Sequence, residues 1–300
     1  MWQSQTSQRQ PNDMSEPVII TVEGRVGVIE LARPDKFNCL YRRAWELIAA
    51  AREDFEKNND VRAILIRAQG KNFCKGADLD EVKSIRGNEA KVRSLMDLGH
   101  GTLLALEASP LPVVAAVQGL ALAGGLELML GADVVFAAKS ARLGDQHAQY
   151  GLIPGWGSSQ RPPRLIGLRR ALDLMYSGKW LTADEALAIG LVNYVVDDDA
   201  LQDEAMAYAA KLSERSRQGL AEIKPLRATA LVLATRTLWH SKWKPQRAIS
   251  SALTPPKVSQ PLKPDANRFS IDAFQISRQP LKIQEYRNDR PLRRFRQAAH

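Results

Sequence analysis

The chain has 300 residues, of which 45% are hydrophobic, enough for one large globular domain with an appendage or for two domains. Its apolar runs are too short to span a membrane, so we expect a soluble protein that does not bind membranes. The two cysteines, Cys39 and Cys74, exclude a disulfide framework and a cysteine-rich metal site, and they fit a reducing cytoplasm.

The net charge of +9 is concentrated at one end of the chain. Residues 226–300 hold 15 Lys and Arg against 4 Asp and Glu, whereas residues 1–225 hold 27 against 29. The tail is also rich in proline and shows no sustained helix or strand period. We therefore expect a disordered polar N-terminal extension (1–15), a main domain (16–224) and a basic, proline-rich tail (225–300).

The first half of the main domain begins with two short strands within residues 17–31, joined by a turn at Gly24. A loop over 32–40 precedes a helix whose apolar stripe comprises Tyr41, Ala44, Trp45, Ile48 and Phe55. The strand AILIRA leads to a glycine turn, KNFCKGADL at 71–79, in which Asp78 could cap the next helix. Residues 89–107 have a helical pattern and end before two prolines.

The most informative stretch is 113–138, VVAAVQGLALAGGLELMLGADVVFAA. A β-branched strand enters a glycine-rich turn that opens a helix at Gly124 and Gly125, and a second apolar strand follows. The first N–H groups of a helix have no internal partner, so they could hold an oxyanion beside Glu127. A buried, paired core glutamate after an ordinary turn explains the same residues equally well.

The second half continues with strands, turns and helices. An ordered loop and short helix over 143–167 bring in His147, and a helix covers 169–176. A capping box at Thr182 and Glu185 begins a helix that Gly190 closes, followed by a strand at 191–196 and a helix at 199–216. Repeated strand–strand–helix units predict an α/β domain of stacked ββα modules.

Several of these stretches, in order and at the same spacing, resemble the crotonase superfamily, the enoyl-CoA hydratase/isomerase group. The resemblance covers residues 16–224 and is carried by ARPDKFNCL, FCKGADL, VQGLALAGGLELMLGADVVFAA, YGLIPGWGSSQR and LTADEALAIGLVNYVV. It implies a crotonase-like spiral of stacked ββα units with a helical C-terminal extension, which is atypical in this chain. It also implies an enzyme of fatty-acid β-oxidation type whose substrate is an acyl-CoA.

The resemblance assigns an oxyanion hole to two backbone N–H groups, those of Ala77 and Gly124, which would hold the thioester oxygen. Residues expected to line bound CoA are Lys36, Phe37, Asn38, Lys75, Gly76, Asp78, Gly125 and Gly155. Either lysine could meet a phosphate, although an exposed lysine beside a loop is commonly just solvated. No metal and no cofactor are expected, since CoA arrives as part of the substrate.

The chain departs from the hydratase pattern at one catalytic position. Hydratases of the family use two glutamates; the first matches Glu127, and the second falls on His147. Imidazole can both accept and donate a proton near neutral pH, and Asp145 could orient the ring or equally cap a turn. We therefore expect hydration of a trans-2-enoyl-CoA, with double-bond isomerisation as the alternative. A purely pocket-lining role for His147 stays open.

The family ends in helices that close over the acyl chain and pack in a trimer or hexamer, but here the resemblance fades after residue 224. One interpretation of the tail is a basic arm that binds RNA, with Trp239, Trp243 and Tyr286 available for stacking, in a non-catalytic protein. The other is a reading frame that changes near residue 225, and we favour it because the tail is irregular. A homotrimer or hexamer is expected if the C-terminus permits.

Overall fold

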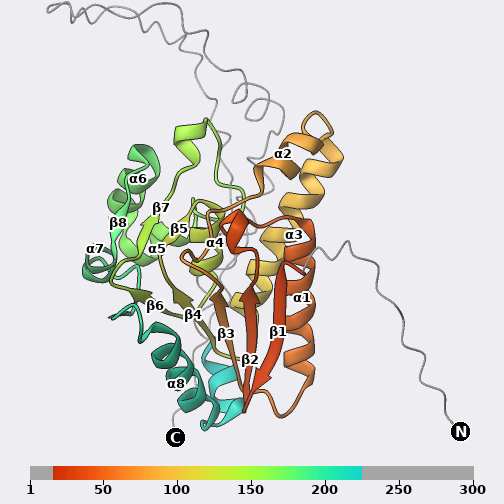
Figure 1. The fold of residues 1–300 in the computed structure, drawn as a ribbon, viewed down its shortest axis with the longest axis vertical. Coiled ribbons are helices and arrows are strands. Elements are labelled where there is room, and N and C mark those ends of the chain that lie inside the picture. The colour runs from red at the N-terminus through yellow and green to blue at the C-terminus, as the bar shows by residue number, and fades with distance from the viewer. Residues whose placement is uncertain (1–15, 225–300) are drawn as a thin grey trace, which may run out of the picture. The chain divides into compact units, whose positions relative to one another are not determined.

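The computed structural model describes residues 16–224, so the expectations for residues 1–15 and 225–300 lie outside the described residues. Within that part the main sheet has the strand order β1-β2-β3-β4-β6-β9 (Figure 1). Only β1 runs antiparallel to its neighbour. The strands are β1 (Val18–Glu23), β2 (Val26–Leu31), β3 (Ala63–Ala68), β4 (Val113–Val117), β6 (Val134–Ala138) and β9 (Tyr194–Val196).

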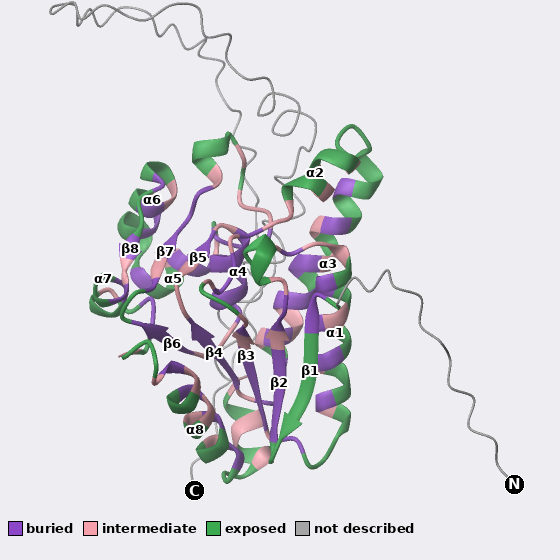
Figure 2. Ribbon diagram, viewed as in Figure 1, coloured by how far each residue is buried: buried purple, intermediate pink, exposed green. Residues whose placement is uncertain are grey.

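Helices cover both faces of this sheet, which explains why its strands β4 and β6 are apolar throughout (Figure 2). Ile64 and Ile66 of β3 pack in the cluster that contains α1 (Arg42–Lys57), α3 (Glu89–Ala108) and α4 (Gly124–Leu130). Ala63 and Leu65 point the opposite way, into a cluster with α8 (Leu201–Ser213). Alternate residues of one strand thus serve two hydrophobic cores.

A second, smaller sheet was not anticipated from the sequence, because its strands are only two or three residues long. It has the order β5-β7-β8, comprising β5 (Leu120–Leu122), β7 (Arg142–Gly144) and β8 (Leu181–Thr182). The first two run parallel, so their carboxyl ends lie side by side. One end continues into α4 and the other into the segment that carries His147, which brings two distant parts of the chain together.

Most of the expected elements are present, with shifted ends. Asp78 caps α2 (Leu79–Ile85), and the predicted capping box begins α7 (Ala183–Ala188). The strand expected at 191–196 pairs only from Tyr194, because the Leu191 N–H still donates to Ala186 O in the turn that ends α7. The other short elements are η1 (Pro34–Lys36), η2 (His147–Tyr150), α5 (Arg161–Ile166) and α6 (Leu168–Ser177).

The helix expected at 199–216 ends earlier than predicted, at Ser213, and a further helical stretch begins at residue 217. The stacked α/β architecture is confirmed. None of the helices within residues 16–224 is long and apolar enough to cross a membrane.

Candidate active site

Two backbone N–H groups lie side by side where β5 meets α4. Gly124 is the first residue of α4, so its N–H has no acceptor within the helix. The segment around Ala77 pairs with Leu40, which accepts from Asp78 N and donates to Gly76 O, both at 2.8 Å. This pairing turns the Ala77 N–H away from Leu40, and within the described residues neither N–H has a backbone acceptor.

Glycine is required for this close approach. Gly76 has φ +109°, and a Cβ there would lie 3.0 Å from Gly124 N. A Cβ on Gly124 would lie 3.3 Å from Ala77 N and would press into the indole of Trp156. The two predicted oxyanion donors are therefore neighbours in space, and together they can hold one negatively charged oxygen.

Ala123, immediately before these groups, has φ 50° and ψ −119°, an unfavourable conformation for a residue with a Cβ. Its N–H donates to Gly144 O at 2.9 Å, across the β5–β7 pair. Such strain costs about 1–3 kcal/mol and persists only where surrounding contacts impose it. The small sheet thus fixes the start of α4, and with it the Gly124 N–H.

Glu127 lies one turn into α4, fully buried. Its Oε1 accepts hydrogen bonds from the backbone N–H groups of Trp156 and Ser158, each at 2.9 Å. Its Oε2 has no hydrogen-bond partner within residues 16–224 and lies 3.6 Å from His147 Nε2. Burial raises the pKa of Glu127 above its ordinary value, although the His147 charge and the Ser158 N–H act in the opposite direction.

His147 is held in place by Asp145. Its ring Nδ1 lies 2.8 Å from Asp145 Oδ1, and its backbone N–H donates to the same oxygen at 3.1 Å. A carboxylate acceptor at Nδ1 places the ring proton there and directs Nε2 toward Glu127. Burial lowers the pKa of His147, but the hydrogen bond to Asp145 and the charge of Glu127 outweigh it, so the pKa lies above the ordinary value.

The three side chains therefore form a chain of acid–base groups, Asp145–His147–Glu127. The pKa of Asp145 is lowered despite its burial, because the His147 ring donates to it and carries positive charge. The hypothesis that His147 takes the second acid–base position, with Asp145 orienting its ring, is consistent with this geometry and stays a prediction. The arrangement can take a proton from one side of a small molecule and return a proton nearby.

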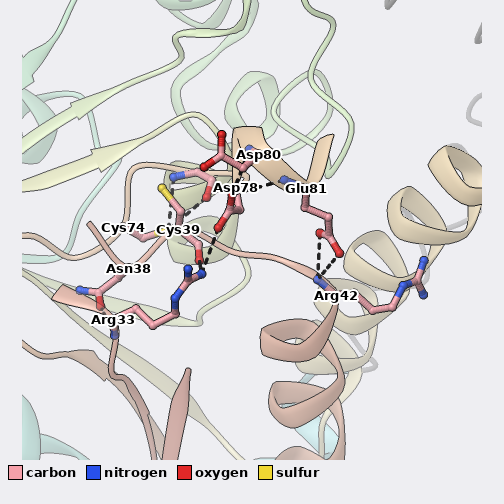
Figure 3. Close-up of polar contacts among 9 residues, drawn as sticks. Arg33, Asn38, Cys39, Arg42, Cys74, Asp78, Asp80 and Glu81 are labelled. Carbon is pink, nitrogen blue, oxygen red and sulfur yellow. Dashed lines mark hydrogen bonds and ion pairs between the residues drawn. The ribbon is translucent and has the colours of Figure 1, made fainter. Parts of the chain in front are cut away.

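The residues expected to line CoA divide into three groups. The first, Asn38 and Asp78, supports the loop at residues 32–40 and the turn that precedes α2 (Figure 3). Asn38 is buried, and its side chain accepts from Arg33 N and donates to Gln69 O and Asn72 O at 2.8–2.9 Å. Asp78 caps α2 and pairs with Arg33 at 3.1 Å. Their side chains are thus engaged with the protein.

The second group lies at the surface. Phe37 is 43% exposed and has φ 52°, Lys36 beside it is also exposed, and Lys75 is half-buried. Lys75 Nζ lies 3.7 Å from the centroid of the Phe37 ring, a cation–π contact. These three residues form a cationic and aromatic surface next to the Ala77 turn, which suits an anionic ligand that also has a flat ring.

The remaining two predicted glycines contact protein atoms. A Cβ on Gly125 would collide with the carbonyl of Cys74, and a Cβ on Gly155 would lie 2.6 Å from Met96 Sδ on α3. Both allow close packing of elements around the site. The sequence did not predict that the N–H groups of Trp156 and Ser158 donate to Glu127. The glycines on either side of Trp156 were the available signal that an unusual turn lies there.

No cluster of three His, Cys, Asp or Glu within residues 16–224 could hold a metal ion. Fold and site together define a class: an α/β protein with two neighbouring backbone N–H groups that can hold an oxyanion, and with a carboxyl–imidazole pair, Glu127 and His147. A family model described as enoyl-CoA hydratase/isomerase matches residues 21–240. The chain belongs to the enoyl-CoA hydratase/isomerase family, which is a family of enzymes.

Two curated relatives illustrate the similarity. A probable enoyl-CoA hydratase of Bacillus subtilis is 36% identical over 210 residues, covering 70% of this chain and 81% of the relative. A short-chain-enoyl-CoA hydratase of Clostridium acetobutylicum is 36% identical over 196 residues, covering 65% and 74%.

Solved structures agree. An enoyl-CoA hydratase subunit from Geobacillus kaustophilus superposes with a TM-score of 0.68 at 36% identity, covering 75% of this chain and 87% of that one. An enoyl-CoA hydratase from Bacillus anthracis gives 0.69 at 32%, covering 74% and 86%. The crotonase-type fold expected from the sequence is thereby confirmed.

Proposed function

We propose that this enzyme adds water to a trans-2-enoyl-CoA and produces a 3-hydroxyacyl-CoA. The observation that carries the proposal is the 3.6 Å approach of Glu127 Oε2 and His147 Nε2. A buried carboxyl group and a half-buried imidazole face one another there, in the same protein that presents the Ala77 and Gly124 N–H groups. Relatives named as enoyl-CoA hydratases at 36% identity support the same reaction.

The proposed chemistry begins with the thioester oxygen between the Ala77 and Gly124 N–H groups. As the water oxygen bonds to C3, the C2–C3 π electrons move toward the thioester oxygen. The resulting enolate is stabilised by the two N–H groups. The Glu127 carboxylate takes a proton from the water, and the His147 imidazolium delivers a proton to C2. The proton on Glu127 then passes to His147 Nε2, which restores the pair. Asp145 stabilises the imidazolium throughout.

We further propose that CoA is the only coenzyme involved and that it arrives with the substrate. The exposed Lys36 and Phe37 and the half-buried Lys75 would meet its nucleotide, with the lysines near phosphate and the ring near the base. Asn38 and Asp78 would act by shaping this loop, because their side chains are engaged elsewhere.

A purified-protein assay with crotonyl-CoA tests the proposal. Hydration removes the conjugated double bond, so the absorbance of the enoyl thioester falls, and the 3-hydroxy product is identified by mass. Isomerisation is the second candidate, because a single proton-carrying side chain such as His147 can move a proton between C2 and C4. Conversion of a 3-enoyl-CoA, combined with no hydration of enoyl-CoAs of any length, would select isomerisation and refute hydration.

Three further expectations stay predictions. The homotrimer or hexamer is tested by light scattering of the eluted protein, and RNA binding by titration at several salt concentrations. A cytoplasmic location fits the free cysteines Cys39 and Cys74. The tail on which RNA binding would depend lies outside the described residues.

A further inference from the structure

The turn that holds Glu127 has an internal support of its own. Trp156 N and Ser158 N both donate to Glu127 Oε1, so the peptide between Trp156 and Gly157 lies between the two donors. Gly157 has φ +118°, a conformation that favours glycine. Any rotation of that middle peptide would move one or both donors off the carboxylate.

Arg161 holds this middle peptide. Its Nη1 donates to Trp156 O at 2.5 Å, and a Cβ on Gly157 would collide with the same nitrogen. The guanidinium therefore fills the inside of the turn. It is 7% exposed, which is unusual for arginine and requires strong partners.

Glu107, near the end of α3, supplies those partners. Its two carboxylate oxygens accept from Arg161 Nε at 2.8 Å and Nη2 at 3.0 Å, a two-bond pairing that fixes the plane of the guanidinium. The contacts form a continuous path: α3, Glu107, Arg161, the Trp156 carbonyl, the two N–H donors and Glu127 Oε1. Because Oε1 is fixed by two donors, Oε2 is the oxygen left to face His147.

We propose that Arg161, anchored by Glu107, is a positioning residue that sets the orientation of Glu127 for proton transfer. The inference rests on the proposed function, because it assumes that Glu127 moves a proton. Arg161 does not contact the reacting atoms. It acts through the backbone of Trp156, and the ion pair with Glu107 keeps its own geometry fixed.

The electrostatic consequence has a defined sign. The charged groups that act on the pKa of Glu127 are His147, Asp145 and Arg161. Burial raises the pKa of Glu127, and the positive charge of Arg161 is among the influences that lower it. His100 on α3 also lies near this ion pair; burial and the Arg161 charge lower its pKa. Removal of the guanidinium should therefore raise the pKa of Glu127.

The test compares three variants with crotonyl-CoA as substrate: Arg161→Gln, Glu107→Gln and, as a control, Arg52→Gln. Arg52 is similarly shielded, with a 13% exposed side chain, and forms ion pairs with Glu53 and Glu56 on α1, outside the site. We expect kcat to fall about 30-fold for Arg161→Gln and about fivefold for Glu107→Gln, with KM within about threefold, because a misplaced catalytic group slows turnover without preventing binding. The control should stay within about twofold.

A second readout needs no turnover. The ¹³C resonance of the Glu127 carboxyl, assigned by its loss in Glu127→Gln, is followed against pH. Arg161→Gln should move its midpoint to higher pH, whereas Arg52→Gln should leave it unchanged. If the parent protein hydrates no enoyl-CoA but the midpoint moves, the proposed reaction fails and the positioning role stands.

Unchanged kcat together with an unchanged Glu127 titration in Arg161→Gln would overturn the inference. Circular dichroism and thermal melting check the fold of each variant. If Arg161→Gln does not fold, Arg161→Lys and Glu107→Gln test the positioning role instead. Arg161→Lys keeps the charge but cannot make both bonds to Glu107. In those two variants, wild-type kcat and an unmoved midpoint would likewise refute the positioning role.

Discussion

The candidate site has two halves, one made of backbone groups and the other of side chains. The oxyanion half consists of the backbone N–H groups of Ala77 and Gly124, brought together because Gly76 and Gly124 lack a Cβ. The acid–base half consists of the side chains of Glu127 and His147, brought together by the parallel pair β5–β7. A backbone donor is kept by any residue that fits the turn, whereas a side-chain acid depends on one residue type.

This difference explains where the chain departs from the hydratase pattern. The glycine turns are intact, but one of the two expected glutamates is His147. The substitution is accompanied by a partner, since Asp145 accepts from the ring and supports its positive charge. If the backbone half holds the thioester as proposed, the reaction type can vary with the side chains while substrate binding is kept.

The largest effect is expected on the side-chain half, for Glu127→Gln. The amide keeps the shape but cannot accept the proton, so turnover should fall at least about 100-fold, since general acid–base groups contribute about 10²–10⁴ in rate. CoA binding, measured by calorimetry with a product analogue, should persist. Turnover near the parent value would make Glu127 a structural residue, and loss of folding, seen by circular dichroism, is a separate result.

Gly124→Ala tests the backbone half. The new Cβ would lie 2.5 Å from the Trp156 ring and 3.3 Å from Ala77 N, so the oxyanion donors must shift apart. We expect kcat with crotonyl-CoA to fall about 100-fold, since one such donor contributes about 10²–10³.

Gly101→Ala is the matched control, because a Cβ there meets nothing within 4 Å. It should leave kcat unchanged and raise stability by about 0.5–1 kcal/mol, because alanine favours a helix interior over glycine. Equal kcat in the two alanine variants would contradict the assigned oxyanion role of Gly124.

His147→Ala should lower turnover by about 100-fold, because the remaining Glu127 has no partner for the second proton. His147→Glu, which restores the family residue, should retain or raise hydration. Substrate affinity should change little in either variant, because in the proposed mechanism backbone groups hold the thioester. If His147→Ala turns over substrate as fast as the parent, His147 only lines the pocket and takes no part in proton transfer.

The pH dependence of kcat follows from the direction of the His147 shift. The pKa of His147 lies above the ordinary value of about 6.5, so the imidazolium donor persists to higher pH and kcat falls as pH rises through the raised pKa. The raised pKa of His147 also stabilises the folded state. This stabilisation is complete below about pH 6.5 and is lost as the pH rises through the pKa of His147 in the folded protein.

Asp145→Asn removes the charge that supports the ring, and it should move the falling limb of the kcat profile toward acid. A pH–rate series on the parent and Asp145→Asn measures this displacement. A limb at the same pH in both would contradict the assigned partnership.

The sequence predicted much of the fold because glycine turns, caps and apolar periods are local signals. Asp78 and the Thr182 capping box are examples, and their structures match. The small β5-β7-β8 sheet could not be predicted, because strands this short carry no periodic pattern and exist only through pairing between distant segments.

The site shows the same division. Glu127 and His147 were identified through the family pattern, but their mutual distance depends on that unpredicted sheet. The buried Arg161 was missed altogether, because an arginine beside two prolines gives no sign that its guanidinium points inward. A side chain that packs inside a turn can be predicted only once the conformation of the turn is known.

The smallest effect is expected where a surface side chain assists the backbone half. Lys75 Nζ stacks on Phe37, so Lys75→Met keeps an apolar contact with the ring and removes only the charge. If that charge meets a CoA phosphate, KM for crotonyl-CoA should rise about two- to fivefold with kcat unchanged, since exposed ion pairs contribute about 0.2–1 kcal/mol. Crotonyl-pantetheine lacks the nucleotide, so its KM should be the same for parent and variant.

Lys57→Met is the matched control for this charge, because Lys57 is exposed at the far end of α1. Added salt should shrink the difference between Lys75→Met and the parent, as screening weakens any exposed phosphate contact. If Lys75→Met and Lys57→Met have the same KM for crotonyl-CoA at low salt, Lys75 does not contact a CoA phosphate. Recognition of CoA would then depend on the loop backbone. An equal rise in KM for crotonyl-pantetheine would instead show that Lys75→Met disturbs the neighbouring Ala77 turn.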